Sequence, residues 1–193
     1  VSMLADLKAL KIVWHQGLDN PNRPIYIISV DGTDFKVWEK KHPHLSIDKG
    51  QYSHKFNHGA LKYEIAIDLW TSRVVWINGP VRAGVHDRVL FDSGLESKVQ
   101  PGKLVITDRV YGQQGRPTAH AKLALPNEMD EETLANFKAR ARCRHETFNG
   151  RLKFFSSLND TYHHSAANHV HVFEAIAVTV IYQMDNGAEI LAA

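Results

Sequence analysis

The sequence has little cysteine and no long apolar run, and both absences narrow the classes of protein to which it can belong. Its single cysteine, Cys143, excludes an internal disulfide and is typical of a reducing compartment. No apolar run reaches the roughly 18 residues that a membrane-spanning helix needs, and no secretory signal is evident. The sequence therefore predicts neither a membrane protein nor a secreted one.

Zinc-site spacings are also lacking, because there is no cysteine pair and no His-Glu-x-x-His motif. Two groups of histidines nevertheless occur. They are His42, His44, His54 and His58 in one segment, and His163, His164, His169 and His171 in another. Without those spacings, we interpret them as surface or helix-end residues in preference to a specific zinc site.

The composition is that of an ordinary globular domain, with one unevenly charged segment. The 193 residues, 44% hydrophobic and 23% charged, predict a single domain over 1–193 with a sizeable core. The net charge is only +2, yet residues 138–153 contain six Lys or Arg and a single acid, Glu146. A local basic segment on a near-neutral chain indicates a polyanionic partner at one face.

Apolar runs bounded by turn residues predict strands early in the chain and helices late. We expect a short amphipathic helix in the first 24 residues, a loop over 39–59 and a short helix over 86–95. Strands are expected over 25–30, 63–70, 73–77 and 103–107. Asn127 is expected to cap a helix that carries the basic segment, and the apolar run 170–182 favours a buried helix over a strand. Together these elements predict a mixed sheet covered by helices.

Two aspartates follow predicted strands, Asp31 after 25–30 and Asp108 after 103–107. Ligand sites collect at the carboxyl ends of strands when helices pack on the sheet. If the two strands are parallel neighbours, the carboxylates lie side by side and repel unless a proton or a cation separates them. Hard divalent cations such as Mg²⁺ prefer such oxygen ligands. Asp-Gly and Asp-Arg are also common turn residues, so the pattern alone leaves a structural role open.

The basic segment has distinct faces when it is drawn as a helix. At 100° intervals, one apolar stripe contains Leu134, Phe137, Ala141, Phe148, Leu152 and Phe155. Glu146 lies outside this stripe, in a polar row with Arg142, Asn149 and Lys153. Arg142 is within reach of an i,i+4 contact with Glu146. The other flank holds Arg140, Arg144 and Arg151, and Arg144 is closest to the stripe, which favours a structural role for it.

The order of these acids resembles the acidic triad of the DDE transposases. Six segments resemble, in order, the blocks of DDE superfamily endonucleases related to Harbinger transposases: SVDGTDF (29–35), YSHKFNHGALKYEIAI (52–67), VVWINGP (74–80), TDRVYG (107–112), RHETFNGRLK (144–153) and HVFEAIAVTV (171–180). The row of Arg142, Glu146 and Lys153 also resembles a signature of cut-and-paste transposases. The resemblance implies an α/β, RNase H-like fold, a mixed sheet of about five strands with helices on both faces.

The resemblance also implies a reaction and a set of roles. Asp31, Asp108 and Glu146 would bind two divalent ions, Mg²⁺ or Mn²⁺, and cut DNA phosphodiester bonds by in-line displacement. Arg142, Asn149 and Lys153 would contact phosphates. A glycine usually precedes the tyrosine after the second aspartate, and Val110 at that position would be strained if φ were positive. A domesticated derivative that binds DNA or chromatin without cutting is the alternative.

The resemblance carries expectations about partners as well. Family transposases have an N-terminal helix-turn-helix module, and the 24 residues before the first predicted strand are too few for one. Sequence-specific recognition is therefore expected to lie outside this chain, for example in a separate DNA-binding protein. We expect a nuclear protein in a eukaryote and a cytoplasmic one otherwise, with oligomers possible in a DNA complex.

Overall fold

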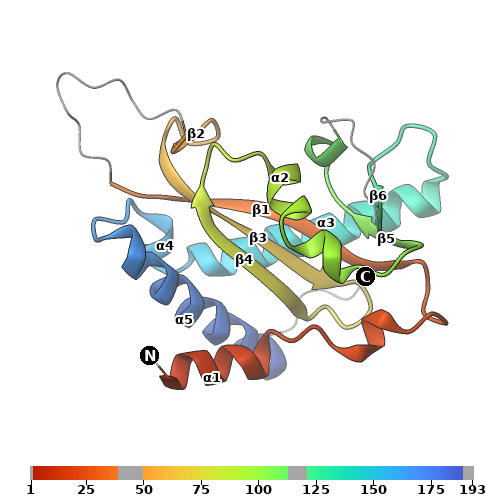
Figure 1. The fold of residues 1–193 in the computed structure, drawn as a ribbon, viewed down its shortest axis with the longest axis horizontal. Coiled ribbons are helices and arrows are strands. Elements are labelled where there is room, and N and C mark those ends of the chain that lie inside the picture. The colour runs from red at the N-terminus through yellow and green to blue at the C-terminus, as the bar shows by residue number, and fades with distance from the viewer. Residues whose placement is uncertain (1, 39–49, 113–120, 189–193) are drawn as a thin grey trace.

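The computed structural model describes residues 2–38, 50–112 and 121–188, and it contains a six-stranded mixed sheet with helices on both faces (Figure 1). The strand order is β2 (Tyr52–Ser53), β3 (His58–Asp68), β1 (Tyr26–Lys36), β5 (Lys103–Ile106) and β6 (Ala121–Ala124), and β4 (Val74–Arg82) also pairs with β3. β1 is antiparallel to β3 and parallel to β5, and β5 is parallel to β6. A mixed sheet flanked by helices confirms the predicted RNase H-like fold, with one short strand more than expected.

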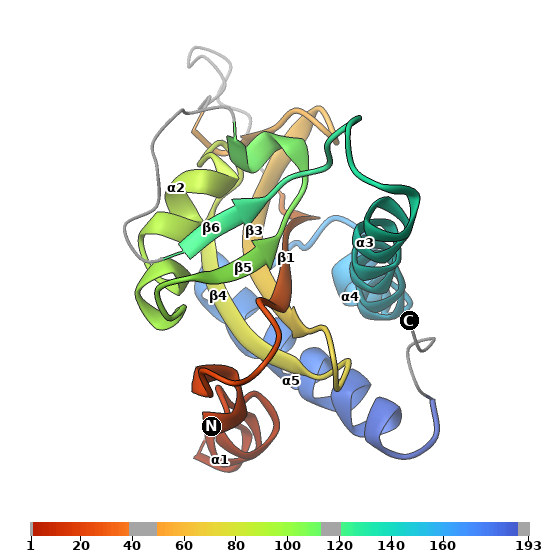
Figure 2. The same ribbon diagram turned by 90° about the vertical axis from the view of Figure 1, so that its right-hand side faces the viewer.

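The helices form a layer on each side of the sheet (Figure 2). One layer contains α3 (Glu132–Lys153), α4 (Ser156–Asn159) and α5 (Ala166–Asp185), and the other contains α2 (Asp87–Asp92) and the 3-10 helix η2 (Leu95–Lys98). Helix α1 (Ser2–Lys11) packs on α5, and the 3-10 helix η1 (Gln16–Asp19) leads into the first strand. No helix in the described ranges is both long and apolar enough to cross a bilayer.

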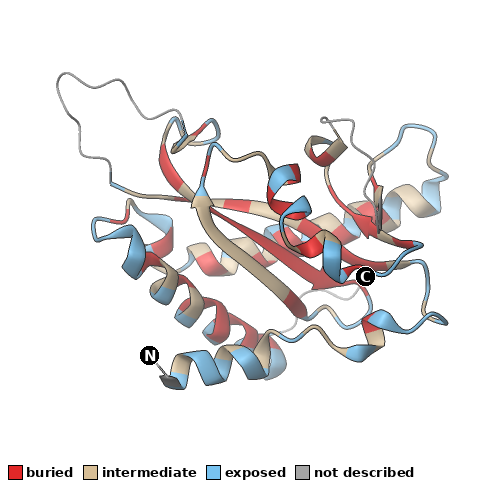
Figure 3. Ribbon diagram, in the orientation of Figure 1, coloured by how far each residue is buried: buried red, intermediate tan, exposed pale blue. Residues whose placement is uncertain are grey.

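Each layer has its own apolar core, and the buried residues follow the sheet and the helix faces turned toward it (Figure 3). On the α3 and α5 side, the core includes Phe35, Tyr63, Phe148, Leu152 and Phe173. On the α2 side, it includes Val30, Ala66, Phe91, Leu95 and Val105. Apolar packing therefore stabilises the sheet on both faces. It also keeps the strand ends that carry the candidate acids in place.

Strand β1 is longer than the sequence predicts, and the added part contains the first aspartate. The expected strand ends before Asp31, whereas β1 continues to Lys36. Asp31 does not begin a turn because it lies opposite Ile65 in the antiparallel register with β3. The parallel partner β5 ends at Ile106, opposite Ser29. The prediction that Asp31 closes its strand is wrong, but Asp31 does lie just beyond the end of the parallel neighbour.

Strand β4 also continues past its expected end. Asn78, Gly79 and Pro80 do not stop it, because a bulge absorbs the glycine and the proline before pairing with β3 resumes. The turn predicted between β3 and β4 is confirmed, and Ser72 there has a φ of 56°. Of the loop expected over 39–59, residues 39–49 lie outside the described residues, and residues 52–53 and 58–59 belong to β2 and β3.

The predicted helices at the two ends of the chain are confirmed, and the start of α3 needs correction. Helix α1 lies within the first 24 residues, and α5 includes the whole of 170–182. Helix α3 begins at Glu132, with Glu131 as its N-cap, and not at Asn127. Asn127 is used in a local turn, where its Oδ1 accepts a hydrogen bond from the Met129 N–H at 3.1 Å. The unpredicted strand β6 has only four residues, too few to show a period.

Candidate active site

Asp31 has a carboxylate that the surrounding protein leaves poorly stabilised. One oxygen accepts a hydrogen bond from the Gly32 N–H at 2.9 Å, and the described residues offer no donor to the other oxygen. Burial and the nearby carboxylates of Asp108 and Asp87 raise the pKa of Asp31 to about 6, although the Gly32 hydrogen bond and Lys55 oppose the shift. Binding a proton or a cation stabilises a carboxylate in such surroundings.

Asp108 follows β5 and begins the turn into the 3-10 helix η3 (Arg109–Gly112). Its Oδ1 accepts a hydrogen bond from the Val110 N–H at 2.9 Å, which holds the carboxylate at the end of β5. In the described chain, the residues other than glycine with positive φ are Asn57 and Ser72, so Val110 is not strained in that way. Because β1 and β5 are parallel neighbours, Asp31 and Asp108 emerge at the same edge of the sheet.

Helix α3 brings Glu146 to this edge because the two preceding residues are tied to the sheet. His145 is buried, and its Nε2 lies 2.9 Å from Ser29 Oγ on β1. Burial lowers the pKa of His145 to about 4, so its ring is neutral at physiological pH. Arg144 is also buried and donates from Nη1 to the Leu69 carbonyl at 2.6 Å, which gives it a structural role.

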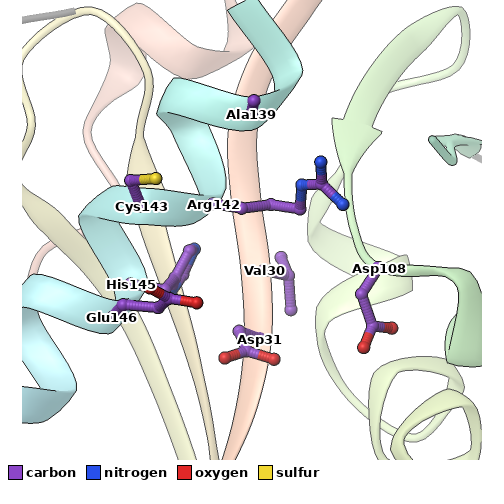
Figure 4. A pocket seen from close by; sticks show the side chains of 8 residues that line it. All are labelled: Val30, Asp31, Asp108, Ala139, Arg142, Cys143, His145 and Glu146. Carbon is purple, nitrogen blue, oxygen red and sulfur yellow. The ribbon is translucent and has the colours of Figure 1, made fainter. Parts of the chain in front are cut away.

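A cavity of about 320 Å³ lies between α3 and this edge of the sheet. Its walls include the three acids Asp31, Asp108 and Glu146, together with Arg142 and His145. Figure 4 shows Asp31 between Glu146, which projects from the helix, and Asp108, which projects from the segment after β5. Three acids that are far apart in the sequence therefore face one space, each from a different element.

Arg142 lines the same cavity, but it does not pair with Glu146 as the helical spacing predicts. Its side chain extends past Val30 toward the side of the cavity that holds Asp108, whereas the Glu146 carboxylate lies beside Asp31 (Figure 4). No ion pair joins these two described residues. The buried Nε of Arg142 has no hydrogen-bond partner in the described chain, so this guanidinium retains donors for a ligand.

Asn149 and Lys153 lie further along the same helix, outside the lining of this cavity. Asn149 is half-buried, and its buried Oδ1 has no partner among the described residues. The Nζ of Lys153 lies 5.6 Å from the ring centroid of Phe35 and 5.4 Å from that of Phe56. The polar row expected on α3 therefore extends beyond the cavity: its first members lie beside the acids, and Lys153 lies beside two aromatic rings at the end of the helix.

Asp87 is a fourth acid at the site, and the sequence analysis missed it. It begins α2 on the other face of the sheet, where its Oδ1 lies 2.8 Å from Lys62 Nζ. A Cβ added to Gly32 would lie only 2.5 Å from this Oδ1, so the residue after Asp31 must be small for the carboxylate to fit. The available sequence signal was an acid at the first position of a predicted helix, which is equally typical of helix stabilisation.

A second cavity, of about 610 Å³, adjoins the first and shares Asp31 and Asp108 with it. Asp87 and Lys62 are on its walls, and so is the exposed Lys55. The two aspartates therefore separate two hollows, one against α3 and one against α2. A long substrate can contact both sides of the acid pair.

The histidine groups contribute little to this site. His169 is buried, with its Nδ1 2.9 Å from the Tyr63 hydroxyl, and it packs in the core beside Phe35. His42 and His44 lie outside the described residues. His54 lines the second cavity and is exposed.

The acid cluster fits a hard divalent cation by its chemistry. Asp31 and Asp108 each use one oxygen on a backbone N–H and keep the other for a ligand, and burial and the nearby carboxylates raise the pKa of Asp31. In the part of the chain that the structure describes, no three His, Cys, Asp or Glu side chains lie close enough to hold one ion as they stand. The three acids would have to rotate toward each other to share an ion.

Comparison with known families shows the family to which the chain belongs. The model of the DDE superfamily endonucleases matches residues 30–180, a range that contains all three acids and most of the chain. Searches of curated proteins and of solved structures found no match. Members of this family act as nucleases on DNA and generally use divalent metals. The chain therefore belongs to the DDE superfamily endonucleases.

Proposed function

We propose that this chain is the nuclease domain of a transposase or of a transposase-derived protein, with Asp31, Asp108 and Glu146 as its catalytic acids. One observation carries the proposal: three acids from three separate elements line one cavity, and burial and the nearby acids raise the pKa of the central one. These acids would hold two Mg²⁺ or Mn²⁺ ions, which supply an activated oxygen nucleophile and stabilise the departing oxygen of an in-line displacement.

The proposed role of each acid follows from its place in the fold. Asp31 lies between the other two and is suited to contact both ions. Asp108 is oriented by the Val110 N–H, and Glu146 by the contact between His145 and β1. During displacement, a water or a terminal 3′-hydroxyl attacks the phosphorus and loses its proton, and the bond to the leaving oxygen breaks. The acids would hold the ions that, together with Arg142, keep the reacting phosphate in position for that attack.

The cations of α3 would bind the phosphates. Arg142 reaches into the cavity from the helix and has an unpartnered donor, so we assign it to the phosphate nearest the reacting bond. Asn149 and Lys153 would contact phosphates further along the strand. Positioned charges of this kind act mainly on the charge that develops in the transition state.

We infer a Harbinger-like subtype from the order of the sequence blocks and from the row of Arg142, Glu146 and Lys153. Such a protein would act in the nucleus of a eukaryotic cell. It would rely on a separate DNA-binding protein to read the target sequence.

The alternative is a derivative that binds DNA or chromatin without cutting. Two observations favour it: the three acids do not yet form an ion-binding cluster, and α3 carries exposed cations such as Arg140. A plasmid nicking assay with Mg²⁺ or Mn²⁺, run beside DNA-binding titrations, separates the two functions. DNA binding without nicking in either metal would support the alternative.

The test of the catalytic assignment replaces each acid by its neutral isostere. Asp31→Asn, Asp108→Asn and Glu146→Gln should each lower the nicking rate by about a hundredfold or more, because each removes a proposed ligand. Matched controls are Glu132→Gln, an exposed acid at the start of the same helix, and Asp160→Asn, an exposed acid after α4. Both controls should nick as the wild type does. A wild-type rate in any of the three site variants contradicts the assignment.

A further inference from the structure

Two lysines from distant elements share one aromatic ring near the acids, and a third lysine lies close to one of them. Lys36 ends β1, Lys55 lies in the turn between β2 and β3, and Lys153 ends α3. The ring of Phe56 has Lys36 Nζ 5.2 Å from its centroid and Lys153 Nζ 5.4 Å from it. Residues that are more than a hundred positions apart in the chain thus form one cationic group, which we call the lysine cluster (Lys36, Lys55 and Lys153).

The lysine cluster has no compensating ion pair among the described residues. Burial, followed by the charge of Lys55, lowers the pKa of Lys153, and Lys36 adds to the effect. The acids Asp34 and Asp31 oppose this shift, but Asp34 already accepts a hydrogen bond from Ser53 Oγ at 2.6 Å. Like charges that are gathered without a direct ion pair repel each other, and an anion placed among them reduces that repulsion.

The lysine cluster also lies near the proposed reaction site. Lys55 lines the second cavity, whose walls include Asp31 and Asp108, so that cavity extends from the acid pair to Lys55. An aromatic ring can hold one cation for structural reasons alone. Two cations on one ring, with a third that lines the cavity shared with the acids, point instead to an extended polyanion.

We propose that the lysine cluster binds backbone phosphates of the DNA strand, next to the position at which the acids would cut. The proposal rests on the proposed function and adds Lys36, Lys55 and Phe56 to the substrate-binding surface. Lys153 is then a shared residue, at the end of the polar row of α3 and at the edge of this second phosphate site. The strand would pass from the acids through the second cavity toward Phe56.

The test measures DNA binding and does not depend on cleavage. A fluorescein-labelled duplex is titrated in EDTA at several salt concentrations with the wild type, Lys55→Gln and the double variant Lys36→Gln/Lys55→Gln. Each lost phosphate contact should reduce the slope of log affinity against log salt by about 0.9. The expected losses are therefore about 0.9 for the single variant and about 1.8 for the double variant. Lys98→Gln, an exposed lysine on η2 that lines neither cavity, is the matched control and should keep the wild-type slope.

The outcomes separate this inference from the catalytic assignment. Slopes equal to the wild-type slope in both variants would overturn the lysine proposal, even if Asp31→Asn had abolished nicking. Reduced slopes would support it, even if Asp31→Asn nicked normally and the catalytic assignment failed. Lys55→Arg keeps the charge and should restore the slope, which shows that a lower slope in Lys55→Gln comes from lost charge and not from misfolding.

Discussion

Asp31 and Asp68 lie on neighbouring strands of one sheet, and the protein stabilises only one of the two carboxylates. Asp68 ends β3 and is fully buried, yet its pKa is lowered because hydrogen bonds outweigh the effect of burial. Asp31 lies in β1, and burial together with nearby acids raises its pKa to about 6. Burial alone would raise both pKa values. The difference therefore comes from the neighbours.

The neighbours of Asp68 satisfy both of its oxygens. Its Oδ1 accepts the backbone N–H groups of Trp70 at 2.7 Å and Thr71 at 3.2 Å. Its Oδ2 lies 2.7 Å from His15 Nε2 and 3.1 Å from Arg23 Nη1. These contacts join the segment before β1 to the end of β3, so the charge of Asp68 stabilises the folded structure.

Asp31 has neighbours of the opposite kind. Asp108 and Asp87 add negative charge near it, and the one backbone hydrogen bond from Gly32 does not offset them. Hydrogen bonds and ion pairs within the chain stabilise the charge of Asp68. Comparable interactions are missing at Asp31, so a ligand has to supply them. A buried acid that lines a cavity and has few stabilising contacts is thus a better indicator of a functional site than burial of an acid alone.

The largest expected effect on stability comes from removing Asp68. Asp68→Ala breaks a buried, hydrogen-bonded ion pair and should lower the free energy of unfolding by about 3 kcal/mol. Asp31→Asn should not lower it, because the variant removes a repelled charge. Urea denaturation of both variants measures the contrast. Equal losses in the two variants would mean that the two carboxylates do not differ in the way described.

A second expected effect is a pH dependence of opposite sign at the two sites. The folded pKa of Asp31 is raised above its unfolded value of 3.8 to about 6, so the folded state binds the proton more tightly. The contribution of Asp31 to stability should therefore fall, by up to about 3 kcal/mol, as pH rises through this window. Asp68, whose folded pKa is lowered, should instead lose its contribution as pH falls below its unfolded value.

The pH effect of Asp31 is isolated by comparing the wild type with Asp31→Asn. Glu64 is buried and its pKa is raised to about 8, mainly by burial, so it adds a similar pH dependence to both proteins. The difference in the free energy of unfolding between the two proteins cancels this contribution. A difference that stays constant from pH 4 to pH 6 would show that Asp31 has an ordinary pKa.

The smallest expected effect is stabilisation by metal. An ion that binds the folded state alone stabilises it by about 1.4 kcal/mol at a concentration ten times its Kd. Mg²⁺ or Mn²⁺ should therefore raise the Tm of the wild type and of Asp68→Ala, and not that of the triple variant Asp31→Asn/Asp108→Asn/Glu146→Gln. An equal rise in Tm for the triple variant would place the ion elsewhere in the molecule.

Local pattern was sufficient to predict most of the secondary structure but not the ends of the strands. Helices α1 and α5 and the central parts of β1, β3, β4 and β5 follow from apolar runs between turn residues. The Asp-Gly and Asn-Gly-Pro segments were misread as strand ends, because antiparallel pairing with β3 and a bulge keep both segments in the sheet. A turn residue predicts a turn only when no neighbouring strand is available to pair with it.

The candidate site was predictable in part for a similar reason. The order of Asp31, Asp108 and Glu146, and the face of α3 that carries Glu146, follow from spacing along the chain. Asp87, the contact of His145 with β1 and the lysine cluster were missed, because each joins elements that are distant in the sequence. The predicted contact between Arg142 and Glu146 does not form, because the two side chains point toward different sides of the cavity.

The sequence by itself determined that acids follow short apolar runs, at Asp31 and equally at Asp68, and that a basic segment carries Glu146. Only the tertiary structure decided which of these acids has its charge stabilised by direct partners within the chain. Asp68 receives His15 and Arg23 from a segment more than forty residues earlier, whereas Asp31 receives the like charges of Asp87 and Asp108. The physical reason is that secondary structure depends on neighbours along the chain, while the free energy of a buried charge depends on neighbours in space.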